Sequence, residues 1–165
     1  TNGSNPSVIR DLLHKYECLD ALAIDIKAPF TPEDYSKAIG INVSSELINK
    51  IEMTLREAFS SNVKLEIRIP LIPSINDSLD SLRKIASTLK KLGYLDKCYG
   101  NRASIILAEV ITEESADPTL KKARKLDLYE VVKLASTINM PNTFIRHRKL
   151  GGKVSVYEAT KSLKL

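Results

Sequence analysis

The stretch LDALAIDIKAP, residues 19–29, decides the fold class that this sequence predicts. Its aliphatic residues alternate with small or charged ones, which is typical of a β-strand, and Pro29 closes the run. Successive side chains of a strand point to opposite faces. One face carries large aliphatic residues: Leu22, Ile24 and Ile26. The other carries small residues followed by charges: Ala21, Ala23, Asp25 and Lys27. We therefore expect one face to pack on helices and the other to open into a site.

Helical and strand patterns alternate along the rest of the chain. Helical periods predict helices that begin at Asn5, Ser44, Leu79 and Asp127, with a short helical turn at 33–38. β-type runs predict strands at 63–72, 103–111, 143–149 and 153–159, the last two joined by the turn LGG. Alternating strands and amphipathic helices favour parallel strands joined by right-handed crossovers. Residues 1–165 are thus predicted to form a single α/β domain, part of an α/β barrel or of an open sheet.

The predicted strand at 63–72 repeats the two-faced pattern, with Glu66 and Arg68 on its charged face. The carboxyl ends of parallel strands lie at one edge, where barrels and open α/β sheets place their sites. Asp25, Lys27, Glu66 and Arg68 are therefore expected to converge. They could form ion pairs, Asp25 with Lys27 and Glu66 with Arg68, or they could contact a ligand. Charges that protect an exposed sheet edge are a third interpretation.

Composition indicates an ordinary globular protein, with 43% hydrophobic, 27% charged and 5% aromatic residues. The net charge of +5 is scattered and not interleaved with aromatic residues, so solvated helix faces explain it better than a nucleic-acid surface. No apolar run is long enough to span a membrane, and the first residues lack the regions of a signal peptide. A cytoplasmic location is therefore expected.

Cysteine and histidine residues give no motif of catalysis or metal binding. Cys18 and Cys98 are far apart and belong to no paired motif, so both are expected to be buried or half-buried free thiols. His14 is expected at the surface, and His147, in the basic hairpin 143–158, is expected to be exposed rather than catalytic. There is no Walker or dinucleotide-binding glycine pattern.

Four short motifs occur in a characteristic order: TNGSNP at 1–6, AIDIKAP at 23–29, EDYSKAIGI at 33–41 and LEIRIPLIPSINDS at 65–78. This set resembles the radical S-adenosylmethionine (radical SAM) activases of glycyl radical enzymes. The activating proteins of anaerobic ribonucleotide reductase and pyruvate formate-lyase are the most similar. The resemblance extends to about residue 92, and beyond that only the strand order agrees. It implies the C-terminal half of a partial (βα)6 TIM-like barrel, ending in a strand or hairpin.

The resemblance also implies which residues bind S-adenosylmethionine. Thr1, Asn2 and Gly3 would form a turn near the ligand. Asp25 and Lys27, as the D-x-K pair, would line the methionine end of its pocket. Arg68 would reach the same pocket, and Pro73 would shape the loop at its rim. The predicted strand at 103–111 departs from the family pattern, so adenosine contacts are not carried over and Glu109 receives no defined role.

The activity implied is the reductive cleavage of S-adenosylmethionine, which yields a 5′-deoxyadenosyl radical that takes hydrogen from a glycine of the partner enzyme. The partners implied are a glycyl radical enzyme, such as anaerobic ribonucleotide reductase, and an electron donor. The 4Fe-4S cluster would be held by a C-x-x-x-C-x-x-C loop preceding Thr1, together with a G-G-E stretch. Neither is in this sequence, so it offers no catalytic residue or metal ligand and is expected to be inactive alone. The uncovered sheet edges of a half-barrel predict association with the missing half or with a second copy.

Two other functions are consistent with the residues. Lys27, beside Asp25 inside a barrel, could be a Schiff-base lysine activated by partial desolvation. Trapping with borohydride and a carbonyl substrate would reveal it. Alternatively, the chain could be a non-enzymatic binding domain that uses its basic surface, in which case nucleic-acid binding would depend steeply on salt.

Overall fold

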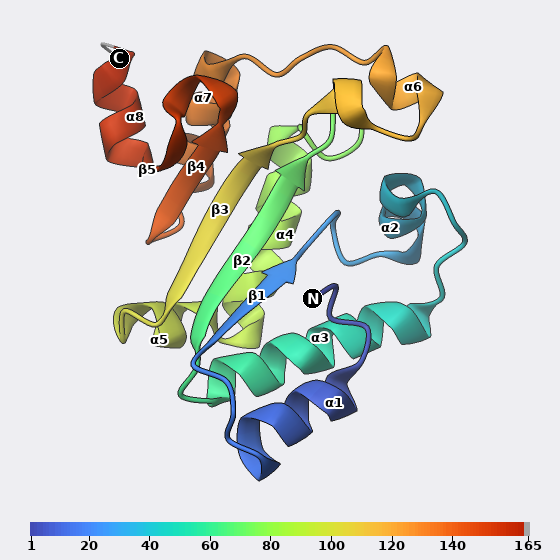
Figure 1. Cartoon of the computed structure of the whole chain (residues 1–165), viewed down its shortest axis with the longest axis vertical. Helices are drawn as coiled ribbons and strands as arrows, with labels where there is room; N and C mark the ends of the chain where they lie inside the picture. The colour runs from blue at the N-terminus through green and yellow to red at the C-terminus, as the bar shows by residue number, and fades with distance from the viewer. Residues whose placement is uncertain (164–165) are drawn as a thin grey trace.

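The computed structural model describes residues 1–163 and contains a five-stranded sheet in the order β1-β2-β3-β4-β5 (Figure 1). The strands are β1 (Ala21–Asp25), β2 (Lys64–Leu71), β3 (Ala103–Glu109), β4 (Thr143–His147) and β5 (Gly152–Ser155). The first four strands pair in parallel, and β5 pairs antiparallel with β4. The predicted α/β class is confirmed. The sheet is open within the described residues and does not close into a barrel.

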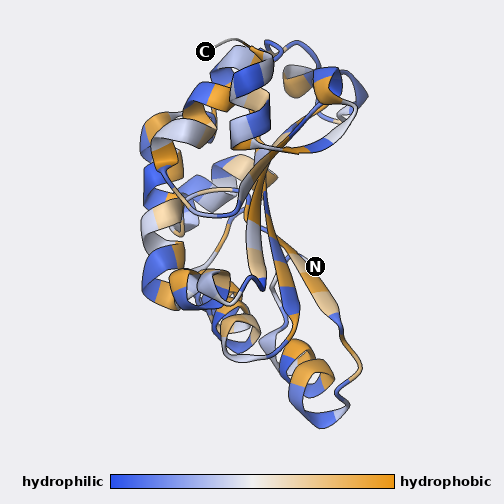
Figure 2. Ribbon diagram, turned by 90° about the vertical axis from the view of Figure 1, so that its left-hand side faces the viewer, coloured by the Kyte–Doolittle hydropathy of each residue, from blue (hydrophilic) through white to orange (hydrophobic). Residues whose placement is uncertain are grey.

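Eight α-helices accompany the sheet in residues 1–163. They are α1 (Pro6–Arg10), α2 (Pro32–Ile39), α3 (Ser45–Ser60), α4 (Leu79–Leu92), α5 (Tyr94–Tyr99), α6 (Pro118–Lys121), α7 (Leu128–Ile138) and α8 (Val156–Ser162). Shorter turns are the π-helical η1 (Asp11–Lys15), which continues α1, and the 3-10 turns η2 (Thr112–Glu114) and η3 (Arg148–Leu150). Figure 2 shows most helices gathered on one side of the sheet, with the opposite side of the central strands left uncovered.

The helices begin where the sequence provides N-caps. The side chains of Asn5, Ser44 and Ser78 each accept a hydrogen bond from a backbone amide in the first turn of α1, α3 and α4. Asp127 and Glu130 form a capping box at the start of α7. The predicted helix starts are therefore confirmed, because each cap satisfies backbone amides that have no partner within the helix.

The core lies between the sheet and the helices. Ile24, Ile67 and Ile105 are neighbours in the register of β1, β2 and β3, and all three are essentially inaccessible. They belong to one cluster with Leu55 of α3 and Leu89 of α4. The predicted packing of the aliphatic strand faces against helices is thus confirmed. Burial of this apolar surface is the main driving force for the fold.

One predicted strand was wrong over its second half, and one helix was not predicted. The expected strand at 153–159 ends at Ser155, because Ser155 and Glu158 form a capping box that starts α8. Helix α5 was not expected, since Gly93 was interpreted as a helix end. Gly93 does end α4, with φ of 112°, but it also turns the chain directly into α5.

None of the helices described within residues 1–163 is long and apolar enough to cross a membrane.

Candidate functional site

The first residue of the chain extends the sheet beside β1. The amino group of Thr1 donates to the carbonyl oxygen of Ala23 at 2.9 Å, and the amide of Asp25 donates to the carbonyl oxygen of Thr1 at 3.1 Å. This alternation of donor and acceptor around Ile24 is the pattern of a parallel ladder. It places the Thr1–Gly3 turn next to Asp25, at the carboxyl end of β1 (Figure 1).

The Thr1–Gly3 turn is fastened to α3. Gly3 adopts a φ of 77°, which residues with a side chain rarely adopt. The hydroxyl of Thr54, fully buried on α3, donates to the carbonyl oxygen of Gly3 at 2.7 Å. The Asn2 side-chain oxygen accepts from both the amide and the hydroxyl of Ser4, at 3.0 and 2.8 Å. The turn therefore has a defined conformation from which Asn2 reaches the candidate site.

The predicted charged residues lie together on the uncovered face of the sheet, and they form pairs. The Lys27 ammonium lies 3.7 Å from the Asp25 carboxylate, and the Arg68 guanidinium lies 2.7 Å from that of Glu66. Lys153 of β5 approaches Glu66 from the other side at 3.2 Å. Arg68 is also the register partner of Asp25. Both ion pairs that the sequence left open as one of three interpretations are formed, yet the side chains of Asp25, Lys27 and Arg68 remain 33–42% exposed and accessible to a ligand.

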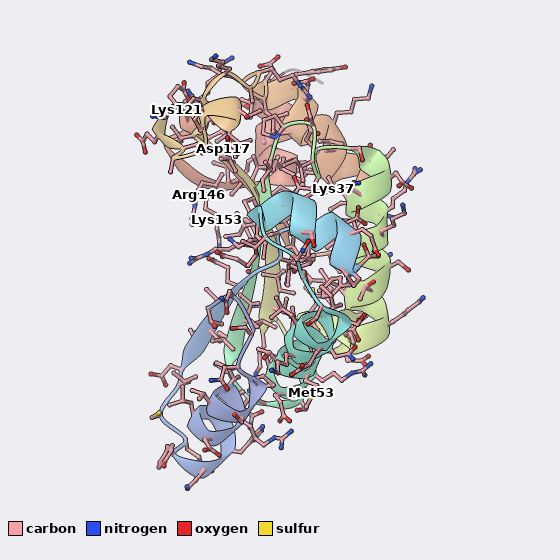
Figure 3. The ribbon with its side chains drawn as sticks, turned by 90° about the vertical axis from the view of Figure 1, so that its right-hand side faces the viewer. Lys37, Met53, Asp117, Lys121, Arg146 and Lys153 are labelled. Atoms are coloured by element: carbon pink, nitrogen blue, oxygen red, sulfur yellow. The ribbon has the colours of Figure 1, made fainter. Side chains whose placement is uncertain are left out.

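Glu66 forms ion pairs with two cations of this face, Arg68 and Lys153. Burial raises its pKa, but hydrogen bonds from Arg68 and Lys153 outweigh that effect and hold the pKa below its ordinary value. Lys153 also lies 4.6 Å from the centre of the Phe144 ring, a cation–π distance. Figure 3 shows Lys153 and Arg146 on the side of the sheet away from α4. Sequence analysis missed Lys153, whose only signal was its place in an alternating strand.

Asn76 joins the carboxyl ends of β1 and β2. It is completely buried, and its amide nitrogen donates to the carbonyl oxygens of Lys27 and Pro70 at 2.7 and 2.8 Å. Its side-chain oxygen accepts from the amide of Ile72 at 2.6 Å. Asn76 therefore fixes the backbone from which Lys27 extends. Pro73, which the resemblance places at the site rim, is buried in the same loop.

A small cavity of about 70 Å³ lies beneath the Thr1–Gly3 turn, where Asn2, Asp25, Lys27 and Tyr35 line it. Tyr35 comes from α2 and is only 3% exposed, and its hydroxyl has no hydrogen-bond partner among residues 1–163. Burial raises the pKa of Tyr35; the nearby backbone amide of Lys27 opposes this, and the Asp25 carboxylate adds to it. The hydroxyl is therefore neutral. Sequence analysis did not single out Tyr35, although it lies in one of the quoted motifs.

A wider hollow of about 530 Å³ occupies the amino-terminal part of the same face. Lys64, Arg102 and Lys153 contribute its positive charge, and Phe144 and several alanines its apolar surface. The Arg102 guanidinium is held by the carbonyl and side-chain oxygens of Asn62, at 3.2 and 2.7 Å. Arg68 lines this hollow and also belongs to the predicted site. Most of the other residues of the hollow lie toward the amino-terminal ends of the parallel strands, away from the predicted site at the carboxyl ends.

His147 is buried, so the expectation that it is exposed was wrong. It is the last residue of β4 and faces the helices, with Nε2 3.1 Å from the Leu126 carbonyl oxygen and Nδ1 accepting from the Lys149 amide. Glu109, also buried, accepts hydrogen bonds from the amide of Arg148 at 2.9 Å and from its guanidinium at 2.5 Å. These contacts fasten the ends of β3 and β4 together and explain both residues structurally.

His14 lies at the surface as expected, 3.3 Å from Glu57. Cys98 is buried as predicted, whereas Cys18 is exposed, because it follows the end of η1 in a surface loop. Residues 1–163 contain no group of three or more His, Cys, Asp or Glu side chains that could hold a metal ion. An iron–sulfur cluster needs several nearby thiolates, so the residues described here do not fit one.

Comparison with known proteins adds no family assignment. No family model matches the sequence, and no curated protein matches it significantly. The function is therefore inferred from the ordered motifs and from the geometry at the carboxyl ends of β1 and β2.

Proposed function

We propose that this chain is the C-terminal part of a radical SAM activating enzyme, which reductively cleaves S-adenosylmethionine to generate a glycyl radical on a partner such as anaerobic ribonucleotide reductase. One observation supports this above all. The backbone of Thr1 pairs in parallel with β1 through Ala23 and Asp25, which brings the T-N-G turn beside the D-x-K residues Asp25 and Lys27. The motifs that carry the resemblance thus meet at one end of one sheet.

The residues at this end fit S-adenosylmethionine chemically. The ligand carries a carboxylate, an ammonium and a sulfonium group. Lys27 and Arg68 can attract the carboxylate, and Asp25 can attract the ammonium. The 3.7 Å between Lys27 and Asp25 is longer than a close ion pair, so both groups can turn to a ligand at little cost. When bound, S-adenosylmethionine would supply the 5′-deoxyadenosyl radical, while this chain would bind and orient its amino-acid end.

The 4Fe-4S cluster is assigned to a segment outside this sequence, because the described residues lack the thiolates for it. In this proposal Thr1 would be the last residue of a strand that pairs in parallel with β1, and the rest of that strand would precede Thr1. The uncovered sheet face, with Glu66, Arg68 and Lys153, would then become the interior of a partial (βα)6 barrel. A cytoplasmic electron donor would complete the system.

The coding sequence upstream of the Thr1 codon tests the proposal. Three further strand–helix units need roughly 80 residues or more. A C-x-x-x-C-x-x-C loop followed by G-G-E within that length would support the assignment. An upstream coding region without clustered cysteines would contradict it. Borohydride trapping with carbonyl substrates would then test Lys27 as a Schiff-base residue instead.

A further inference from the structure

We propose that the hollow in the amino-terminal part of the uncovered sheet face binds a small organic phosphate, with its phosphate groups at Lys64 and Arg102 and its planar ring beside Phe144. The hollow has a volume of about 530 Å³, a size typical of small-molecule sites, and lies on the side of the sheet without helices (Figure 2). The inference does not rest on the proposed function, because the site for S-adenosylmethionine lies at the carboxyl ends of the strands. Three features carry it: an excess of positive charge, free hydrogen-bond donors and an apolar floor.

Positive charge in the hollow exceeds negative charge. Its lining includes four cations and one carboxylate, which are Lys64, Arg68, Arg102, Lys153 and Glu66. The Glu66 carboxylate is already shared by Arg68 and Lys153, at 2.7 and 3.2 Å. Within residues 1–163, neither Lys64 nor Arg102 forms an ion pair. An anion that binds beside these two cations therefore gains electrostatic attraction without breaking an existing pair.

A neighbouring lysine shows the effect of this charge. Lys97 of α5 is 7% exposed, and its ammonium donates to the carbonyl oxygen of Ser61. Its pKa is lowered by burial and, in addition, by the positive charge of Arg102. A carboxylate close by would have the opposite effect on this pKa. The amino-terminal end of the sheet therefore has a positive potential, which attracts anions from solution.

Arg102 is held in place while part of its guanidinium stays free. Its Nη1 atom donates to the carbonyl and side-chain oxygens of Asn62, at 3.2 and 2.7 Å, whereas its Nε and Nη2 atoms donate no hydrogen bond within residues 1–163. The Arg102 backbone is fixed as well, because its carbonyl oxygen accepts from the amide of Leu65 at 2.7 Å. A positioned guanidinium with free donors suits the adjacent oxygens of a phosphate group.

The floor of the hollow is formed by short side chains. Ala21 and Ala23 of β1 and Ser104 of β3 lie on either side of β2, in register with Lys64 or Glu66. They leave room for a flat group next to Phe144, which is half-buried on β4. Burial of a ring on this surface adds a hydrophobic contribution that inorganic phosphate lacks. The combination favours an organic phosphate, such as a nucleoside phosphate, over a simple anion.

Calorimetric titration of the whole 165-residue chain with adenosine diphosphate, at low salt and without divalent cations, tests the proposal. Lys64→Gln and Arg102→Gln should each weaken binding about tenfold. K64Q should also keep the wild-type melting temperature, because the Lys64 side chain is exposed and forms no ion pair in the described residues. Arg83→Gln is the matched control. Arg83 is exposed on α4, on the other side of the sheet, so R83Q should leave the affinity unchanged.

Inorganic pyrophosphate separates the contributions of the charge and the ring. It should bind more weakly than adenosine diphosphate, and Phe144→Leu should weaken only the binding of adenosine diphosphate. Absence of binding of both probes to the wild-type chain, or equal affinity of wild type, K64Q and R102Q, would overturn the proposal. Tighter binding of a short oligothymidylate than of adenosine diphosphate would also overturn it, in favour of single-stranded nucleic acid. The proposed function is tested separately, because K64Q and R102Q should bind S-adenosylmethionine as the wild type does.

Discussion

The side-chain amide of Asn76 donates a hydrogen bond to the backbone carbonyl oxygen of Lys27, with 2.7 Å between nitrogen and oxygen, although the two residues are 49 positions apart in the chain. The same amide also donates to the carbonyl oxygen of Pro70, and the Asn76 side-chain oxygen accepts from the backbone amide of Ile72. One buried side chain thus sets the relative position of the two strand ends that carry Asp25, Lys27 and Arg68. Sites of this kind depend on such support, since a small displacement of a charged group weakens ligand binding.

Replacing Asn76 by alanine should lower the free energy of unfolding by about 3 kcal/mol. Three buried backbone groups lose their partner, and each unsatisfied group costs about 1–3 kcal/mol. Urea unfolding followed by circular dichroism measures the change. Asn49, exposed on α3, provides the control, and Asn49→Ala should change stability by less than about 0.5 kcal/mol. Equal stability of both variants would show that Asn76 does not hold the strand ends together.

Thr54→Val should loosen the Thr1–Gly3 turn. Valine has nearly the shape of threonine but leaves the Gly3 carbonyl oxygen without its 2.7 Å hydrogen bond, so we expect a loss of about 1–2 kcal/mol. Faster amide hydrogen exchange at Gly3 and Ser4 should accompany it. Thr137→Val is the control, because the Thr137 hydroxyl is exposed and bonds only within its own helix. Unchanged hydrogen exchange in T54V would show that the Thr54 hydrogen bond does not hold the turn in place.

Stability should fall in acid partly through Glu66. Its pKa is below the ordinary value of 4.5 in the folded chain, so its stabilising effect is present above that pH and is lost as the pH falls through the folded pKa. Unfolding of Glu66→Gln should therefore depend less steeply on pH below about 4.5. Glu52→Gln serves for comparison, since Glu52 takes part in no ion pair in the described part of the chain. Parallel pH profiles for wild type and E66Q would refute this role.

Arg148→Ala should lower the free energy of unfolding, because it leaves the carboxylate of Glu109, whose side chain is 3% exposed, without its guanidinium partner. Adding Glu109→Gln should restore part of the loss, since the remaining group is then uncharged. The double mutant unfolding at the same urea concentration as R148A would argue against this pairing. Lys84→Ala breaks an exposed pair with Asp80 and should leave the urea midpoint nearly unchanged.

The sequence predicted those features that depend on local patterns. The alternation in residues 19–29 and 63–72 correctly separated the buried faces of β1 and β2 from the charged ones, and N-caps located the helices. Features that depend on contacts between distant segments were missed. Asn76, Tyr35 and Lys153 reach the site from a loop, a helix and a distant strand, and only the folded chain brings them to Lys27 and Glu66.

His147 was predicted to be exposed and is buried, again because of contacts between distant segments. A histidine between basic residues suggests an exposed surface, yet the alternation of β4 turns it inward, where the Leu126 carbonyl and the Lys149 amide satisfy both ring nitrogens. The partners that allow its burial lie on η3 and on the segment before α7. Local composition could not indicate them, because a buried polar group is tolerated only where the fold provides its hydrogen bonds.

The most direct test of the central claim is a nuclear magnetic resonance titration of the isotopically labelled chain with S-adenosylmethionine. Binding at the carboxyl ends of β1 and β2 predicts that the largest shifts occur at the backbone amides of Asn2, Gly3, Asp25 and Lys27, and that Lys27→Ala abolishes them. No shifts at any ligand concentration, or shifts confined to the hollow around Lys64 and Arg102, would contradict the assignment of this site.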